Sequence, residues 1–137
     1  MSEVNIRDTG RNSARTSDVR ELATKVQKPS DTEAITAANT ITAAESGTRY
    51  VLNVAAAKIQ TLPTPAAGLE YWFYVGATEP TGTHTVVTAS SANIIVGNVS
   101  SPEDAAGSVA TVTDADTISF VASKAVHGDF VHVWSDG

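Results

Sequence analysis

Three histidines, His84, His127 and His132, are the residues of this sequence best suited to bind a metal or transfer a proton. Imidazole and carboxylate groups ligate transition metals, so the spacing of His127, Asp129 and His132 allows a metal site as one interpretation. On a strand, however, Asp129 and His132 point to opposite faces. We therefore predict no metal site, and we expect His132 to be a packed or interface residue that makes a hydrogen bond.

The sequence contains none of the short motifs that mark common catalytic centres. It has no Gly-x-Ser-x-Gly turn, no glycine-rich phosphate loop, no His-Glu-x-x-His pair and no cysteine. Its acidic residues are scattered, and most of them lie beside turn formers, where a charge is normally solvated. These acids are Glu45, Glu79, Glu103, Asp104, Asp114 and Asp136. We therefore predict neither an enzyme nor a cofactor, with a small glycan hydrolase as a third alternative function.

The densest apolar run of the chain extends from Leu69 to Val75, after a segment that contains Pro63, Pro65 and Gly68. The two prolines and the glycine interrupt regular structure before the run. Aromatic and β-branched residues within the run favour a strand. Because both of its alternating faces are apolar, we expect a facing sheet or a neighbouring subunit to cover each side.

The end of the chain predicts a second aromatic face, on which Phe130, His132 and Trp134 alternate with two valines. The rings of the earlier run, those of Tyr71, Trp72, Phe73 and Tyr74, are of a kind that usually packs in a core or a subunit interface, and sugar stacking is the alternative. Base stacking is disfavoured because no basic residues accompany the rings. The residues predicted to lie in the oligomer interface or the core are Tyr71, Trp72, Phe73, Tyr74, Phe130, His132 and Trp134.

From residue 34 onward, short apolar segments alternate with turn signals at the spacing of an all-β domain. Pro80 and Gly82 predict a hairpin turn, and the stretch 98–107 predicts an exposed loop. The predicted fold is an antiparallel β-sandwich or barrel of about eight or nine short strands, formed by residues 34–137. A chain of 137 residues fits one such domain. Strands are predicted near residues 38–42, 49–54, 58–62, 69–75, 83–89, 93–97, 108–113, 116–122 and 129–135.

Residues 1–33 are predicted to form an extended N-terminal arm. Six basic and six acidic residues balance its charge, and its few large apolar residues cannot offset the entropy cost of ordering. A short helix is predicted near residues 19–28, because Asp18 and Glu21 have capping-box spacing and Pro29 ends the segment. The arm is either a disordered tail or a segment that orders against a partner. Its predicted contact residues are Val4, Ile6, Arg7, Arg11, Arg15, Val19, Arg20, Leu22 and Val26.

Charge and hydropathy limit the partners of the chain. Residues 34–137 contain three basic and nine acidic residues, and an acidic surface disfavours nucleic acid. No apolar run approaches the ~20 residues of a membrane span, and residues 1–10 lack the apolar centre of a signal peptide. We therefore expect synthesis in the cytoplasm, with no nucleic-acid partner and no membrane partner.

Several strand-and-turn segments after residue 40 resemble those of tailed-bacteriophage virion proteins. The pattern is similar to that of the small head decoration, or cement, proteins, and similar stretches form modules of tail fibres and spikes. Such sequences continue into a further aromatic strand at the point where this one ends. The segments are Ile41 to Gly47, Tyr50 to Asn53, Ile59 to Pro63 with Pro65 and Gly68-Leu69, Phe73 to Gly76, Ala92 to Gly97, Asp116 to Ala122, Gly128 to Val131 and Trp134 to Gly137.

The resemblance implies a structural role on the outer surface of an icosahedral phage head. It implies that the chain binds the major capsid protein, stabilises contacts between capsomers and associates as a homotrimer. In this setting, the arm at residues 1–33 is expected to be the main element in contact with the shell. The alternative function is a carbohydrate- or receptor-binding module of a phage tail fibre or spike.

Overall fold

The computed structural model of the protein describes residues 31–90, 92–100 and 109–137. Residues Thr32–Gly137 form one compact unit. Its regular structure consists of strands and one short 3-10 helix, η1 (Ala43–Glu45), in the part of the chain that is described. The all-β prediction is therefore confirmed. The predicted arm helix at 19–28 and all the predicted arm contact residues lie outside the described residues.

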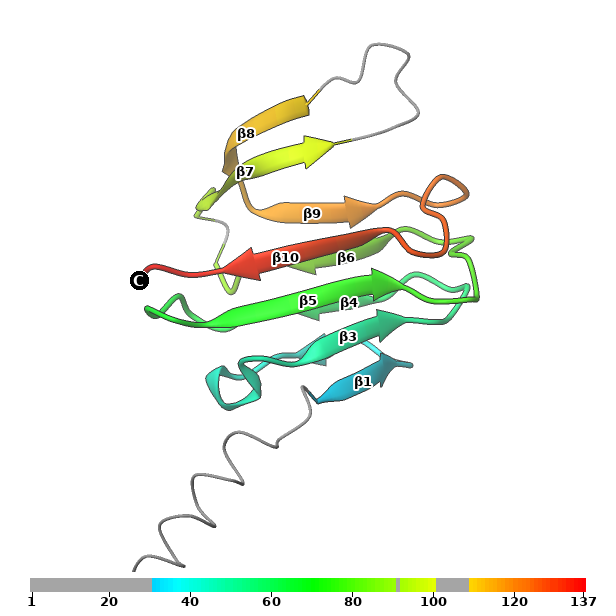
Figure 1. Cartoon of the computed structure of the whole chain (residues 1–137), viewed down its shortest axis with the longest axis horizontal. Coiled ribbons are helices and arrows are strands. Elements are labelled where there is room, and N and C mark those ends of the chain that lie inside the picture. Colours follow the sequence, from blue (N-terminus) through cyan, green and yellow to red (C-terminus); the bar gives the residue numbers. More distant parts are fainter. Residues whose placement is uncertain (1–30, 91, 101–108) are drawn as a thin grey trace, which may run out of the picture. The chain divides into compact units, whose positions relative to one another are not determined.

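Two four-stranded sheets and one hairpin contain the described strands (Figure 1). The order of sheet A is β1–β3–β5–β10, and that of sheet B is β2–β4–β6–β9. The strands of sheet A are β1 (Thr32–Ile35), β3 (Arg49–Leu52), β5 (Glu70–Val75) and β10 (Phe130–Trp134). Those of sheet B are β2 (Asn39–Thr40), β4 (Ile59–Thr61), β6 (His84–Val87) and β9 (Thr117–Phe120). The hairpin consists of β7 (Ile95–Ser100) and β8 (Val109–Ala115).

The chain alternates between the two sheets over its first six strands. Each return to a sheet repeats the earlier direction, so β1, β3 and β5 are parallel, and so are β2, β4 and β6. Only β10 and β9 join the sheets in antiparallel orientation. The predicted antiparallel fold is therefore wrong for these two parallel groups, and the mixed sheets do not close into a barrel. Turn residues locate the end of a strand, but they do not specify the strand beside it.

The crossing between β5 and β6 corrects a second prediction. The sequence predicts a hairpin turn at Pro80 and Gly82, but β5 and β6 belong to different sheets. The segment between β5 and β6 instead packs against the segment between β3 and β4. There the N–H groups of Thr81 and Gly82 both donate to Ala55 O at 2.9 Å. A Cβ atom at Gly82 would lie 2.5 Å from Ala57 N, so this close approach requires glycine.

The positions of the strands agree better with the sequence than their pairing does. All nine predicted strands overlap with β2 to β10. The missed strand, β1, begins at Thr32, within the range predicted for the arm, and only Ile35 in it is buried. One buried residue gives no periodicity to detect. In addition, β7 extends to Ser100, into the stretch predicted as a loop.

One hydrophobic core is shared by the inner faces of the two sheets. Tyr50 of β3 and Phe73 of β5 lie at its centre, with ring centroids 5.3 Å apart. Alternation along each strand supplies one inward residue in two, as expected for a sheet with one covered face. The buried core residues are Ile35, Ile41, Tyr50, Leu52, Leu62, Tyr71, Phe73, Val75, Val86, Phe120 and Ala125.

Sheet B also turns two polar residues, Gln60 and His84, into the interior, where both are fully buried. The His84 ring joins two backbone groups of the crossing between β3 and β4. Its Nδ1 accepts a hydrogen bond from Lys58 N–H at 3.1 Å, and its Nε2 lies 2.9 Å from Val54 O. These contacts fit a neutral ring with the proton on Nε2. His84 is therefore a structural residue that fixes the crossing.

Candidate interaction surface on sheet A

The aromatic residues of β5 divide between the two faces of sheet A. Tyr71 and Phe73 point inward and are buried, whereas Trp72 and Tyr74 point outward and are half-buried. The sequence predicts cover on both sides of this strand, and the structure shows full cover on the inner side only. Of the residues predicted for the core or an interface, two therefore belong to the core.

The aromatic residues of β10 are more exposed than those of β5. Phe130 and Trp134 are 64% and 67% exposed, and His132 lies between them on the same face. The valines of β10 point inward and pack against the core, so the predicted alternation along this strand is confirmed. These three residues therefore lie outside the core of the single chain, and their assignment to an oligomer interface stays a prediction.

Strand register brings the outward residues of β3, β5 and β10 into rows across the sheet. One row contains Arg49, Trp72 and His132. The Trp72 and His132 rings stack with centroids 4.4 Å apart and planes 2° from parallel, and Arg49 Cζ lies 5.9 Å from the Trp72 ring centroid. In the next row, Tyr74 stacks on Phe130 at 5.7 Å. We refer to Trp72, Tyr74, Phe130, His132 and Trp134 as the outer aromatic face.

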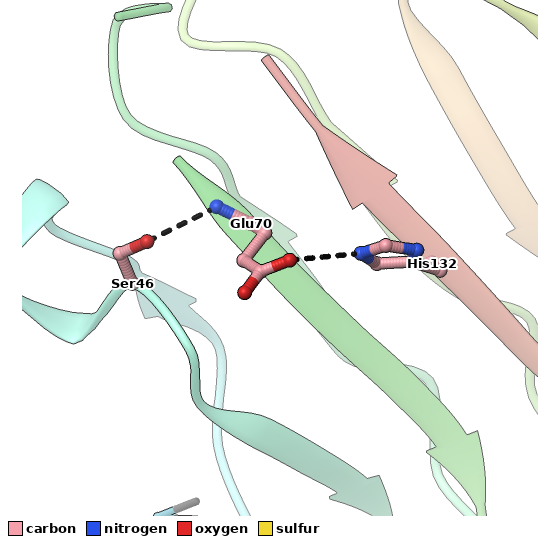
Figure 2. Close-up of polar contacts among 3 residues, drawn as sticks. All are labelled: Ser46, Glu70 and His132. Atoms are coloured by element: carbon pink, nitrogen blue, oxygen red, sulfur yellow. Dashed lines mark hydrogen bonds and ion pairs between the residues drawn. The ribbon is translucent and has the colours of Figure 1, made fainter. Parts of the chain in front are cut away.

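A polar contact fixes the outer aromatic face at one end. Glu70 of β5 lies opposite Trp134, and its Oε2 is 3.4 Å from His132 Nε2 (Figure 2). The Glu70 N–H donates to Ser46 Oγ at 3.1 Å. Both side chains of the Glu70–His132 pair are partly exposed, so the pair adds little stability. Its effect is to orient the His132 ring parallel to Trp72.

A second polar cluster supports the loop that precedes β3. The Glu45 carboxylate accepts hydrogen bonds from Thr42 Oγ1 and Thr42 N, both at 2.7 Å, and from Tyr50 OH at 3.3 Å. The hydrogen bonds from Thr42 lower the pKa of Glu45 below its usual value. Burial and the nearby Glu45 carboxylate raise the pKa of Tyr50 and Tyr71. Thr42 precedes η1, and its N–H donates a hydrogen bond to the Glu45 side chain, so the two residues form a capping box for this helix. The role of the cluster is therefore structural.

The residues considered for a metal site serve other purposes. The Asp129 Oδ2 atom accepts a hydrogen bond from Val126 N–H at 2.9 Å, which closes the turn before β10. His127 is exposed in the same turn, and His132 contacts Glu70. In the described part of the chain, no group of three or more histidine and acidic residues could hold a metal ion.

The hairpin is a second exposed apolar region, which the sequence pattern does not reveal. Val96 and Val99 of β7 are 70% and 57% exposed. A two-stranded hairpin is barely stable alone in water, and its side chains pack little against the core. The apolar run from Ile94 to Val96 predicts a strand, but it cannot show that the strand lies outside both four-stranded sheets.

Comparison with known proteins gives no match to a family model, a curated protein or a solved structure. The described residues include no helix that is long and apolar enough to cross a membrane. The outer aromatic face is therefore the candidate functional site on structural grounds. It gathers exposed rings on the surface of a hydrogen-bonded sheet, which is a geometry for contact with another molecule.

Proposed function

We propose that this chain is a structural virion protein that decorates the outer surface of an icosahedral phage head and stabilises contacts between capsomers. The observation that carries the proposal is the outer aromatic face, where side chains available for contact occupy a rigid sheet. The resemblance to head decoration proteins adds the setting. In this proposal the major capsid protein is the partner, and copies of the chain associate with one another, as a homotrimer according to the resemblance.

The mechanism proposed for stabilisation is avidity. Each chain combines contacts of the arm at residues 1–33 with contacts of the β domain, and several copies act together on neighbouring shell subunits. Linked contacts of modest strength resist dissociation better than any one of them alone. The domain supplies rigidity, because its strands fix the positions of the outward side chains.

The test is to measure the copy number of this protein in purified virions and to titrate the purified protein onto undecorated shells. The proposal expects a copy number comparable to that of the major capsid protein and saturable binding to shells. Deletion of residues 1–31, which leaves all of β1 in place, should weaken shell binding while circular dichroism still shows a folded β domain. A copy number as low as that of tail proteins, or no binding to shells, contradicts the proposal.

The exposed Trp134 beside Glu70 favours a second candidate, a carbohydrate-binding module of a tail fibre or spike. An open indole next to a carboxylate can stack on a sugar ring and accept its hydroxyl hydrogen bonds. The other tryptophan does not fit this use, because Trp72 is stacked between His132 and Arg49. Binding of purified protein to a glycan array, lost in Trp134→Ala, would support this candidate over the first.

A further inference from the structure

The strand β10 forms one edge of sheet A and lacks the features that protect exposed edges. Residues 130–134 include no proline, no lysine and no acidic residue. Among the described strands, β10 pairs only with β5. Unprotected apolar edges of this kind add further strands. The corresponding strand of sheet B is different, since β9 has Thr117 and Ser119 exposed on its outer face.

The pairing of β10 with β5 determines which backbone groups remain open at the edge. The Ser135 N–H donates to Leu69 O at 2.8 Å, and alternate residues of an antiparallel strand direct their backbone groups to the same side. The backbone N–H and C=O groups of Val131 and Val133 therefore face β5. The N–H and C=O groups of Phe130, His132 and Trp134 face away from it. These residues thus present both their side chains and their backbone groups to a partner.

We propose that two copies of this chain associate by antiparallel pairing of their β10 strands, which joins two A sheets into one continuous sheet. A two-fold axis at His132 places Phe130 of each copy opposite Trp134 of the other. In this register the residues with open backbone groups, Phe130, His132 and Trp134, lie opposite one another, so the hydrogen bonds of both edges are satisfied. A two-fold contact requires a self-complementary surface of this kind.

The proposed pair also accounts for the positions of the exposed rings. In the single chain, Phe130 has Tyr74 on one side, toward the centre of the sheet, and its other side faces the edge. Trp134 has no ring contact within the described residues and is opposite Glu70. Pairing continues the row of Tyr74 and Phe130 onto Trp134 of the other copy. Cross-strand aromatic pairs are among the stabilising pairs of antiparallel sheets.

This inference rests on the self-association in the proposed function but replaces the homotrimer with a two-fold pair, and it is tested on the purified chain without any shell. Failure of shell binding would leave it intact, and failure of pairing would leave decoration by single chains intact. The resemblance implies three copies, whereas the edge register closes with two. The measured mass distinguishes these states, since one chain has a mass of 14.2 kDa.

The first experiment uses Phe130→Lys and Trp134→Glu, alone and combined, with light scattering over a concentration series. Wild type should have the mass of two chains, and each single variant should associate about tenfold or more weakly, which corresponds to ~1.4 kcal/mol. The double variant, and an equimolar mixture of the two single variants, should regain association. In both cases the introduced lysine and glutamate face each other across the axis. Ile59→Lys, at an exposed position of sheet B, should leave the mass unchanged.

The second experiment does not depend on the strength of association. The chain has no cysteine, so His132→Cys introduces a single thiol at the proposed axis. Directly opposed residues of a hydrogen-bonded pair have Cα atoms ~5.5 Å apart, which is within the range for a disulfide. Mild oxidation should convert His132→Cys into a covalent dimer, whereas Ile59→Cys should stay mostly uncrosslinked.

The wild-type rings of Phe130 and Trp134 are both about two-thirds exposed. Circular dichroism should therefore show folded protein for each single variant. Three results overturn the proposal: a wild-type mass of one chain or three chains, a double variant that associates no better than the single variants, or His132→Cys that crosslinks no faster than Ile59→Cys. If a lysine or glutamate variant is unfolded, the crosslinking comparison decides the question by itself.

Discussion

Sheets A and B have the same construction, three parallel strands completed by an antiparallel one, but they present different outer faces. The outward residues of sheet A include the stacked rings of the outer aromatic face. The corresponding rows of sheet B contain Thr61, Val87 and Thr117 in one row and Ile59, Thr85 and Ser119 in the other. Five of these six residues are β-branched, and such residues stabilise a pleated strand without offering the contact area of an aromatic ring.

The inner faces differ in the opposite sense. Sheet A contributes a purely apolar and aromatic layer to the core, whereas sheet B inserts Gln60 and His84. Gln60 Nε2 donates to Ala37 O at 3.1 Å, and the ring of His84 contacts two backbone groups. Sheet B therefore uses its interior to hold the crossings in place, whereas sheet A places aromatic rings on its exterior. The comparison shows that connectivity alone does not assign a role to a sheet.

The largest expected effect separates the two faces of sheet A. Phe73→Ala should lower the free energy of unfolding by about 3–5 kcal/mol, because it removes a fully buried ring from the core. Trp134→Ala should lower it by less than about 1 kcal/mol, because the ring is largely exposed in the single chain. Urea titration of dilute protein measures both values. If both variants lost the same free energy of unfolding, the inner and outer faces of sheet A would be equally covered, and the contrast drawn between them would be wrong.

A histidine in each sheet provides the next test. His84→Leu should cost roughly 2–6 kcal/mol, because Lys58 N–H and Val54 O both lose their partner and each such loss costs about 1–3 kcal/mol. The matched change His132→Leu, on the outer face of sheet A, should cost less than about 1 kcal/mol. Thermal unfolding of dilute samples compares the two. A His84→Leu variant as stable as wild type would contradict the structural role given to His84.

The smallest expected effect concerns pH and the loop beside sheet A. Glu45→Gln should cost about 1 kcal/mol at neutral pH, the usual value of a capping interaction. Because the pKa of Glu45 is lower in the folded chain than its usual 4.5, its contribution is present above that value. The contribution is lost as the pH falls through the folded pKa.

The stability difference between wild type and Glu45→Gln should therefore shrink as the solution is acidified. Urea titration at a series of pH values between neutral and strongly acidic measures this difference. Glu79→Gln, in an exposed position of the crossing after β5, is the control and should match wild type throughout. A constant difference between wild type and Glu45→Gln at all pH values would show that the carboxylate charge does not contribute to the capping box.

Local sequence determined the strands and their two faces. The apolar run from Leu69 to Val75 and the alternation from Phe130 to Trp134 predict β5 and β10 correctly. The side-chain period of a strand is an intrinsic property of its backbone. The same local information also predicts that Gly82 lies in a connection. It cannot predict the glycine's contact with Ala57, since the two residues belong to different crossings.

Tertiary structure alone decided which strands are neighbours, and with that it decided the site. Parallel pairing of β3 with β5 depends on a return through sheet B, and turn residues do not encode the destination of the chain. The stack of Trp72 on His132 joins residues far apart in sequence, because register across the sheet is set by the joint burial of both strands. The sequence therefore specifies which side chains are aromatic and on which side of a strand they lie. Only the assembled sheet leaves Phe130 and Trp134 exposed at an open edge.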